Sequence, residues 1–155
     1  MESEATRDDR RRLRILIVDD DLMGRRLLQK FLSPYGECDT AVDGKEALLA
    51  FRLAWEKNQP YDLICLDIVM PEMDGRTVLK EMRAWEQEHG MDVGTGAKII
   101  MTTAVEDTDE VLLAFNLGCE AYVFKPIERE KLLSKMEGLN LIESRAPIGS
   151  SGAAG

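Results

Sequence analysis

Five short apolar runs, each followed by a longer amphipathic segment, limit most strongly how this chain can fold. The runs lie at residues 15–18, 37–42, 63–66, 99–101 and 122–124. All but the second lack the alternation that marks a strand with one wet face, so we expect strands buried on both faces. The second run contains Glu37 and Asp39, and we expect it at an edge of the sheet. Strands that alternate with helices predict an α/β fold with a parallel sheet between helical layers.

The segments between the runs carry apolar residues three and four positions apart, which is the spacing of one helix face. The residues expected to face the sheet are Leu27, Leu28, Phe31, Leu32, Ala47, Leu48, Phe51, Trp55, Val78, Leu79, Met82, Trp85, Val111, Leu112, Phe115, Leu132, Leu133, Met136 and Leu139. Asp21 is expected to cap the first helix. Residues 1–11 are expected to be a flexible arm, residues 12–142 one folded domain, and residues 143–155 a disordered tail or linker.

Charge and composition argue against several classes of function. A formal net charge of −9 disfavours direct binding to the phosphate backbone of a nucleic acid. The basic run from Arg10 to Arg14 is interpreted as a solvated arm. Neither a segment long enough for membrane insertion nor the apolar core of a signal peptide is evident. Three cysteines without CxxC spacing indicate reduced thiols in a cytoplasmic protein.

Polar residues stand at the ends of four of the predicted strands. Asp19 and Asp20 follow the first strand, Asp67 ends the third, and Thr103 and Lys125 end the fourth and fifth. Because the carboxyl ends of parallel strands share one edge of the sheet, we expect these side chains to lie together. Three neighbouring carboxylates repel one another, and a hard divalent cation such as Mg²⁺ removes that repulsion. With a lysine and a hydroxyl added, the set suits a phosphoryl group attacked by an aspartate.

Each of these residues also has an ordinary structural role. An aspartate after a strand is commonly a helix cap, a lone threonine is commonly structural, and a lone lysine is commonly solvated. Their joint placement at four strand ends favours a functional site over several unrelated structural roles.

Four segments of the chain carry a family resemblance. They are Ile15 to Asp20 (ILIVDD), Leu66 to Gly75 (LDIVMPEMDG), Met101 to Ala104 (MTTA) and Ala121 to Pro126 (AYVFKP). In order and spacing they resemble the receiver domain of two-component response regulators, including the single-domain chemotaxis type. The resemblance covers about residues 13 to 140. It implies a flavodoxin-like (βα)5 three-layer sandwich whose parallel five-stranded sheet has the order 2-1-3-4-5.

The resemblance also implies a metal site and a phosphate acceptor. Asp67 matches the aspartate that a histidine kinase phosphorylates. Asp20 matches a direct Mg²⁺ ligand, and Asp19 matches its acidic neighbour, which often acts through water. The backbone carbonyl of Val69 would be a further ligand, and Mn²⁺ could replace Mg²⁺.

The remaining matches describe a switch. Thr103 matches the hydroxyl that moves toward the phosphoryl group, and Lys125 matches the lysine that pairs with it. Tyr122 matches the aromatic that swings inward in the active state, although plain core packing is an alternative for it. Ala104 is small, as a partly open phosphate site requires, and the Lys125–Pro126 bond would be cis. The added charge would bias a surface built from the last two helices and the fifth strand.

The implied function is a phosphoacceptor signalling domain rather than an enzyme, which at most catalyses its own phosphorylation and dephosphorylation. Its partners would be a histidine kinase or phosphotransfer protein and a downstream protein target, and it would act as a monomer or a phosphorylation-dependent dimer. The chain could also be one domain of a longer regulator, with the polar segment after residue 143 as a linker. Two alternative functions stay open. One is a receiver-like interaction module that does not use phosphate. The other is a haloacid-dehalogenase-type phosphatase, in which Asp19 and Asp21 form a DxD motif.

Three features depart from the family pattern. Segment 86–97 is longer and more polar than the family loop, so we expect partner contacts there to differ. The amino-terminal arm has no assigned role. Val69 and Val105 put apolar side chains near the phosphate site, where a polar group could orient a hydrolytic water. We therefore expect moderate to slow self-dephosphorylation.

Overall fold

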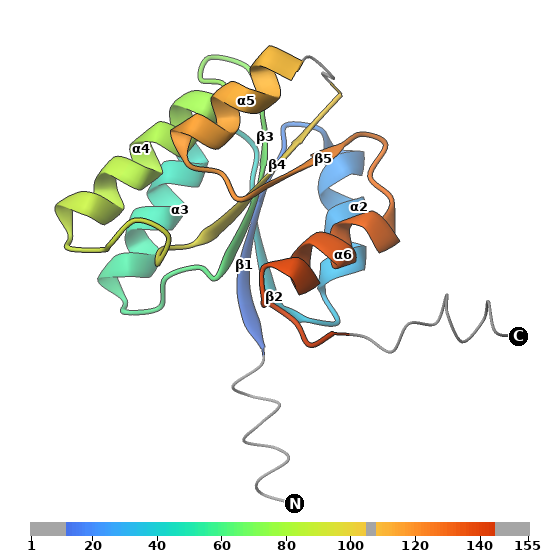
Figure 1. Cartoon of the computed structure of the whole chain (residues 1–155), viewed down its shortest axis with the longest axis horizontal. Coiled ribbons are helices and arrows are strands. Elements are labelled where there is room, and N and C mark those ends of the chain that lie inside the picture. The colour runs from blue at the N-terminus through green and yellow to red at the C-terminus, as the bar shows by residue number, and fades with distance from the viewer. Residues whose placement is uncertain (1–11, 105–107, 145–155) are drawn as a thin grey trace, which may run out of the picture.

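The computed structural model describes residues 12–104 and 108–144. In these ranges strands and helices alternate along the chain (Figure 1). In chain order they are β1 (Leu13–Val18), α2 (Leu22–Leu32), β2 (Gly36–Ala41), α3 (Gly44–Glu56), β3 (Leu63–Asp67), α4 (Gly75–Glu88), β4 (Lys98–Thr103), α5 (Thr108–Leu117), β5 (Ala121–Phe124) and α6 (Arg129–Gly138).

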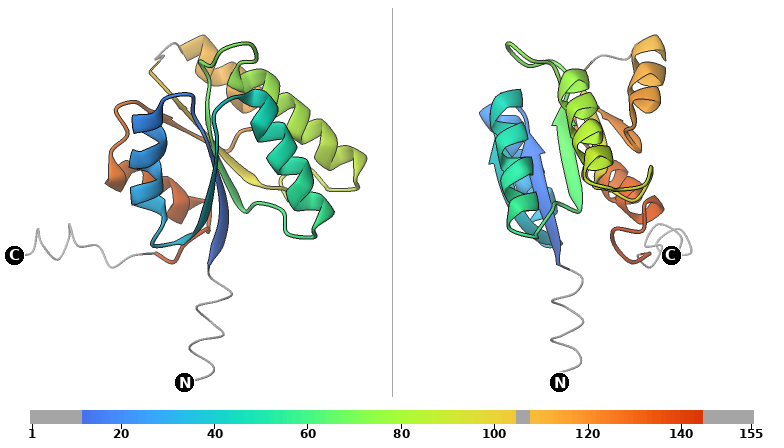
Figure 2. Two further views of the ribbon diagram at one scale, coloured as in Figure 1. Left: turned by 180° about the vertical axis from the view of Figure 1, so that it is seen from behind. Right: turned by 90° about the vertical axis from the view of Figure 1, so that its left-hand side faces the viewer.

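The strands form one parallel five-stranded sheet in the order β2-β1-β3-β4-β5. Helices α2 and α6 cover one face of the sheet, and α3, α4 and α5 cover the other (Figures 1 and 2). The predicted flavodoxin-like sandwich is therefore confirmed, with the polar strand β2 at an edge as expected.

Two apolar cores, one on each face of the sheet, explain why the inner strands lack polar alternation. Ile15 and Ile17 point into the core under α2 and α6, whereas Leu16 and Val18 point into the core under α3 and α4. All four side chains are fully buried. A parallel strand that is covered on both faces must be apolar at every position, which is the pattern found in the sequence.

Aspartates begin three of the helices and fix where the preceding loops end. Asp21 caps α2, with its Oδ2 accepting a hydrogen bond from the Gly24 amide at 3.0 Å, as the sequence predicts. Asp43 caps α3 and Asp74 caps α4 in the same way. These caps satisfy amide groups that have no partner inside the helix, and they place each helix directly after its strand or loop.

Three of the residues predicted to face the sheet are exposed instead. The exposed fractions are 37% for Leu27, 56% for Leu112 and 42% for Phe115. Helix α5 carries apolar residues on more than one side, and only Ala114 is fully buried on it. A helix can press only one stripe against a sheet, so the other apolar side chains of α5 are left at the surface. The remaining residues expected to face the sheet are buried or pack against the two cores.

Several smaller predictions can be compared with the structure. The Lys125–Pro126 bond is cis, as expected. The three cysteines are free thiols, and burial raises the pKa of both Cys65 and Cys119 to about 12. Among the described residues no helix is both long and apolar enough to cross a membrane. The expected arm at residues 1–11 and all but the first two residues of the expected tail lie outside the described residues.

Candidate functional site

Three carboxylates meet at the carboxyl edge of the sheet. One oxygen from each of Asp19, Asp20 and Asp67 lies within 4.8 Å of the other two. The register of β1 and β3 places Val18 opposite Leu66, so Asp19 and Asp67, which follow these two residues, come side by side. Asp19 is fully buried and Asp67 is 3% exposed, whereas Asp20 is exposed. Solvent therefore reaches the cluster from the side of Asp20.

Lys125 supplies positive charge to this cluster. Its Nζ lies 2.9 Å from Asp19 Oδ2 and 3.3 Å from Asp67 Oδ2. The end of β5 delivers this side chain, and the Lys125 amide donates to the Thr103 carbonyl at 2.7 Å. Burial lowers the pKa of Lys125, but the contacts with Asp19 and Asp67 outweigh it and raise that pKa. The lysine is therefore a cation shared between two buried carboxylates.

Asp67 is the carboxylate most strongly affected by its surroundings. Burial raises its pKa to about 6, against the opposing effect of Lys125, and the charge of Asp19 raises it further. Lys125 thus does not offset the cost of ionising Asp67 at this buried position. The three carboxylates offer oxygen ligands alone, the donor set that Mg²⁺ prefers, and a divalent cation there would favour the ionised form of Asp67.

The loop after β1 holds Asp19 in place. Asp19 Oδ1 accepts a hydrogen bond from the Asp21 amide at 2.9 Å, and the Asp19 carbonyl accepts one from Arg25 Nη1 at 2.8 Å. The carboxylate of Asp21 faces the amino-terminal end of α2, where it caps the helix. Asp21 therefore does not belong to the acidic cluster. This weakens the hypothesis that the chain is a phosphatase with a DxD motif at Asp19 and Asp21.

The loop after β3 packs closely against the backbone of Asp67 and Ile68. The Gly75 amide donates to the Ile68 carbonyl at 2.8 Å. A Cβ on Gly75 would lie 2.1 Å from the Asp67 carbonyl oxygen, so only glycine fits this close approach. The MPEMDG segment thus ends in a glycine because the loop must pack against the backbone of the candidate acceptor.

The other predicted site residues lie on β4 and β5 or in the loops that follow β3 and β4. Thr103 is fully buried at the end of β4, and Ala104 follows it at the surface. Tyr122 is 7% exposed and packs in the core under α3 and α4, so its ring is inward in this structure. The Val69 amide donates to Asp67, and the Val69 side chain is 60% exposed. Val105 lies outside the described residues.

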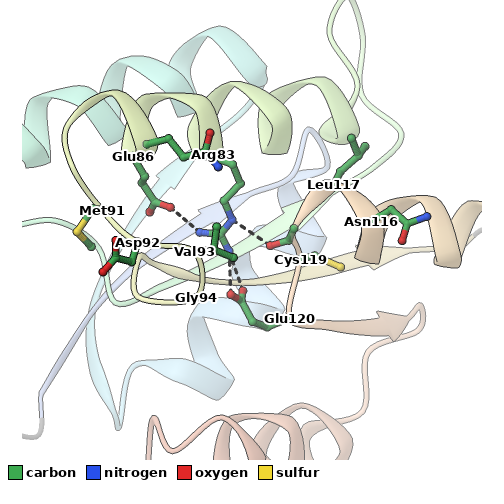
Figure 3. Close-up of a pocket in the computed structure, with 12 residues that line it drawn as sticks. Arg83, Glu86, Met91, Asp92, Val93, Gly94, Asn116, Leu117, Cys119 and Glu120 are labelled. Atoms are coloured by element: carbon green, nitrogen blue, oxygen red, sulfur yellow. Dashed lines mark hydrogen bonds and ion pairs between the residues drawn. The ribbon is translucent and has the colours of Figure 1, made fainter.

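Figure 3 shows a second polar cluster, which the sequence analysis did not predict. It lies where the chain enters β4 and β5, at the other end of the strands from the three carboxylates. Its centre is Arg83 on α4. Arg83 Nη1 lies 2.8 Å from Glu86 Oε1, and Nη2 lies 2.8 Å from Glu120 Oε1. Arg83 also donates to the carbonyls of Ala97 and Gly118, at 2.8 and 2.9 Å. The guanidinium group therefore joins α4 to the segments that lead into β4 and β5.

The two glutamates extend this cluster to the backbone. Glu86 Oε2 accepts from the Ala97 amide at 2.9 Å, and Glu120 Oε1 accepts from the Ile99 amide at 2.7 Å. A hollow of about 380 Å³ lies beside them, lined by α4, residues 91–94 and residues 116–120. The sequence did carry a signal, because Glu86 lies four residues after Met82 and so falls on the buried face of α4.

Comparisons with known proteins agree with this geometry. The family model described as response regulator receiver domain matches residues 15–137. A probable transcriptional regulator ycf27 of Cyanophora paradoxa is 35% identical over 127 residues, 81% of this chain and 47% of that protein. Chemotaxis protein CheY of Treponema pallidum is 30% identical over 125 residues, 79% of each protein. The structure of a CheX-CheY-BeF3-Mg complex from Borrelia burgdorferi matches with a TM-score of 0.70 and 29% identity, over 83% of this chain and 89% of that chain.

The lengths of these relatives limit what the comparisons say. The chain spans about half the length of the ycf27 regulators and of the DNA-binding response regulator MtrA of Mycolicibacterium smegmatis. It spans most of the Treponema chemotaxis protein. The matches therefore concern the folded domain, and the expectation of a single-domain type stays a prediction.

Proposed function

The chain belongs to the response regulator receiver domain family, and on this premise we propose that Asp67 accepts a phosphoryl group from a histidine kinase or a phosphotransfer protein. One observation carries the proposal: a buried Asp67 carboxylate lies within 4.8 Å of ligand oxygens of Asp19 and Asp20 and 3.3 Å from Lys125 Nζ. A receiver domain is a phosphoacceptor module rather than a dedicated enzyme, so its output is a change in its own surface.

In the proposed reaction a carboxylate oxygen of Asp67 attacks the phosphorus atom of the donor. The bond between phosphorus and the donor's imidazole nitrogen breaks, the nitrogen keeps the electron pair, and Asp67 becomes an acyl phosphate. Charge on the phosphoryl oxygens is offset by Lys125, whose Nζ already lies beside Asp67. The Thr103 hydroxyl would donate to one of these oxygens.

The metal in this proposal is Mg²⁺, for which Mn²⁺ can substitute, held by the three carboxylates and the Val69 carbonyl. When bound it supplies positive charge to the phosphoryl oxygens. The all-oxygen donor set supports this assignment. The raised pKa of Asp67 also supports it, because burial outweighs the opposing effect of Lys125.

The proposed output is a switch at the face formed by α5, β5 and α6. Thr103 and Tyr122 lie on neighbouring strands, and movement of Thr103 toward the phosphoryl group would leave room beside the Tyr122 ring. The same face exposes Leu112, Phe115 and Phe124, which is apolar surface of the kind that protein partners cover. A downstream protein target that binds this face would respond to the position of Tyr122.

We place this reaction in the cytoplasm, where the three free cysteines would remain reduced. The chain would act as a monomer or as a phosphorylation-dependent dimer. Its net charge of −9 supports a protein target over direct contact between this domain and nucleic acid.

The test is uptake of a phosphoryl group from acetyl phosphate with Mg²⁺, followed by intact mass. Wild-type protein should gain one phosphoryl group, and Asp67→Asn should gain none. Asp92→Asn, which removes an exposed carboxylate from the far edge of the sheet, is the matched control and should behave as wild type.

Other outcomes identify the alternatives. An adduct that persists in Asp67→Asn but is lost in Asp19→Asn would favour the phosphatase. If wild type forms no adduct and does not bind fluoroberyllate, the domain is an interaction module that does not use phosphate.

A further inference from the structure

A buried hydroxyl beside the candidate acceptor has no use in the mechanism above. Thr102, on β4, is fully buried, and its Oγ1 has no hydrogen-bond partner among the described residues. Valine has the same shape without the hydroxyl. A buried hydroxyl without a partner has lost its hydrogen bonds to water and gained none, so valine would be the more stable choice for a purely structural position.

The strand register places Thr102 next to Asp67. These two residues are directly paired between β3 and β4, and on its other side Thr102 pairs with Val123 of β5. Side chains two residues apart on a strand share a face. Cys65 and Ile100, two residues before Asp67 and Thr102, both point into the core under α2 and α6. Asp67 and Thr102 therefore point to the same face as direct cross-strand neighbours.

Thr103, the threonine of the proposed switch, is separate from this pair. It follows Thr102 by one residue and so points to the opposite face, the one into which Tyr122 packs. The two adjacent side chains thus leave β4 on different sides of the sheet. Thr103 is the last residue of the strand, and the proposed switch moves its hydroxyl toward the phosphoryl group, whereas Thr102 pairs directly with Asp67.

Phosphorylation would change which hydrogen-bond donors are available to the Asp67 side chain. In the resting structure its carboxylate receives hydrogen bonds from Lys125 and from the Val69 amide. In the proposed reaction Lys125 turns to the phosphoryl oxygens, and one carboxylate oxygen becomes bonded to phosphorus. The remaining carbonyl oxygen of the acyl phosphate then loses a donor, and a neighbouring buried hydroxyl can replace it by rotation about χ1.

We propose that Thr102 is a positioning residue, whose hydroxyl donates a hydrogen bond to the Asp67 carboxyl group once that group carries a phosphoryl group. This inference rests on the proposed function of Asp67. A neutral hydrogen bond of this kind corresponds to about a 3- to 10-fold change in an equilibrium constant.

The experiment compares wild type with Thr102→Val, Thr102→Ser and Thr40→Val, the last being a control on the exposed part of edge strand β2. Calorimetry measures fluoroberyllate affinity in the presence of Mg²⁺, and intact mass measures the rate of uptake from acetyl phosphate. Thermal unfolding in buffer with a chelator reports stability without metal or phosphoryl group.

We expect Thr102→Val to unfold at a higher temperature than wild type and to bind fluoroberyllate about 3- to 10-fold more weakly. Thr102→Ser, which keeps the hydroxyl, should retain most of the wild-type affinity. Thr40→Val should match wild type in affinity. A position that matters only for packing would show the gain in stability without the loss of affinity.

Three results would overturn the inference. Wild-type affinity in Thr102→Val would show that the hydroxyl is not used, although Asp67 is still phosphorylated. Equal losses in the valine and serine variants would assign the effect to packing of the threonine methyl group. If wild type neither binds fluoroberyllate nor takes up phosphoryl, the proposed function fails first and the inference fails with it.

Discussion

Replacing Arg83 with methionine should destabilise the fold far more than replacing an exposed arginine. Methionine keeps the apolar stem of the side chain and removes the guanidinium group. Within the described part of the chain, the carboxylates of Glu86 and Glu120 would then each keep one backbone amide as hydrogen-bond donor. The carbonyls of Ala97 and Gly118 would also lose their arginine donor.

The size of the effect follows from burial. The side chains of Arg83, Glu86 and Glu120 are 18%, 6% and 20% exposed. Breaking a buried ion pair costs roughly 3–5 kcal/mol, and the partial exposure of Arg83 and Glu120 places this cluster near the lower value. At roughly 2–4 °C per kcal/mol for a chain of this size, Arg83→Met should lower the unfolding temperature by about 6–12 °C.

The control is Arg52→Met on α3. Arg52 lies 3.9 Å from Glu81, and the two side chains are 44% and 52% exposed. Such a surface pair contributes about 1 kcal/mol or less. Urea unfolding followed by circular dichroism gives both free energies on one scale.

A second substitution separates uncompensated charge from lost packing. In the Arg83→Met background, Glu86→Gln should restore part of the stability, because it removes a buried charge that has lost its counterion. In wild type the same substitution should destabilise. If Arg83→Met stays within about 1 kcal/mol of wild type, the cluster contributes no more than a surface pair and this reasoning is wrong.

Three further predictions concern the acceptor site. In metal-free buffer near pH 7.5, Asp67→Asn should be more stable than wild type by up to about 3 kcal/mol in the free energy of unfolding. Ionisation of Asp67 does not lower the stability of wild type below the unfolded pKa of 3.8, and it lowers that stability most above the folded pKa of about 6. Urea titrations from pH 4 to pH 8 measure this, and a difference that does not grow with pH would contradict it. Mg²⁺ should raise the melting temperature of wild type more than that of Asp20→Asn, as scanning fluorimetry can measure; equal shifts would remove Asp20 from the ligand set. Gly75→Ala should lower the melting temperature by several degrees, since its Cβ would lie 2.1 Å from the Asp67 carbonyl oxygen. Gly138→Ala is the control and should not lower it, because its Cβ would meet no described atom within 4 Å apart from its chain neighbours and the nearby backbone of its own helix. Equal melting temperatures of the two variants would show that the loop shifts at no cost.

The positions of the strands and the acidic cluster could be predicted from local patterns, whereas the strand order 2-1-3-4-5 was implied by the family resemblance. Buried runs locate the strands, and the geometry of a parallel sheet brings Asp19, Asp67 and Lys125 to one edge wherever the chain places them. Side-chain rotamers and loop paths are not needed for that inference. The buried position of Asp19 likewise follows from its place directly after a fully covered strand.

Features that depend on contacts between distant segments were not predictable in the same way. Arg83, Ala97 and Glu120 come from three separate segments, and nothing in their own neighbourhoods marks them as partners. The exposure of Leu112 and Phe115 depends on which side of a helix with more than one apolar side faces the sheet. That choice is made by packing and is not encoded in the spacing of apolar residues alone.

The sharing of Lys125 between two buried carboxylates links phosphoryl uptake to a cation. Asp67 must be ionised to attack phosphorus, yet burial raises its pKa to about 6. Lys125 Nζ is shared between Asp19 Oδ2 at 2.9 Å and Asp67 Oδ2 at 3.3 Å, so turning to an incoming phosphoryl group would take this positive charge away from both carboxylates. With a divalent cation bound to the carboxylates, Lys125 is no longer needed by both of them. The proposed acceptor should therefore react slowly in metal-free buffer even with a small donor, because the lysine it needs is already engaged.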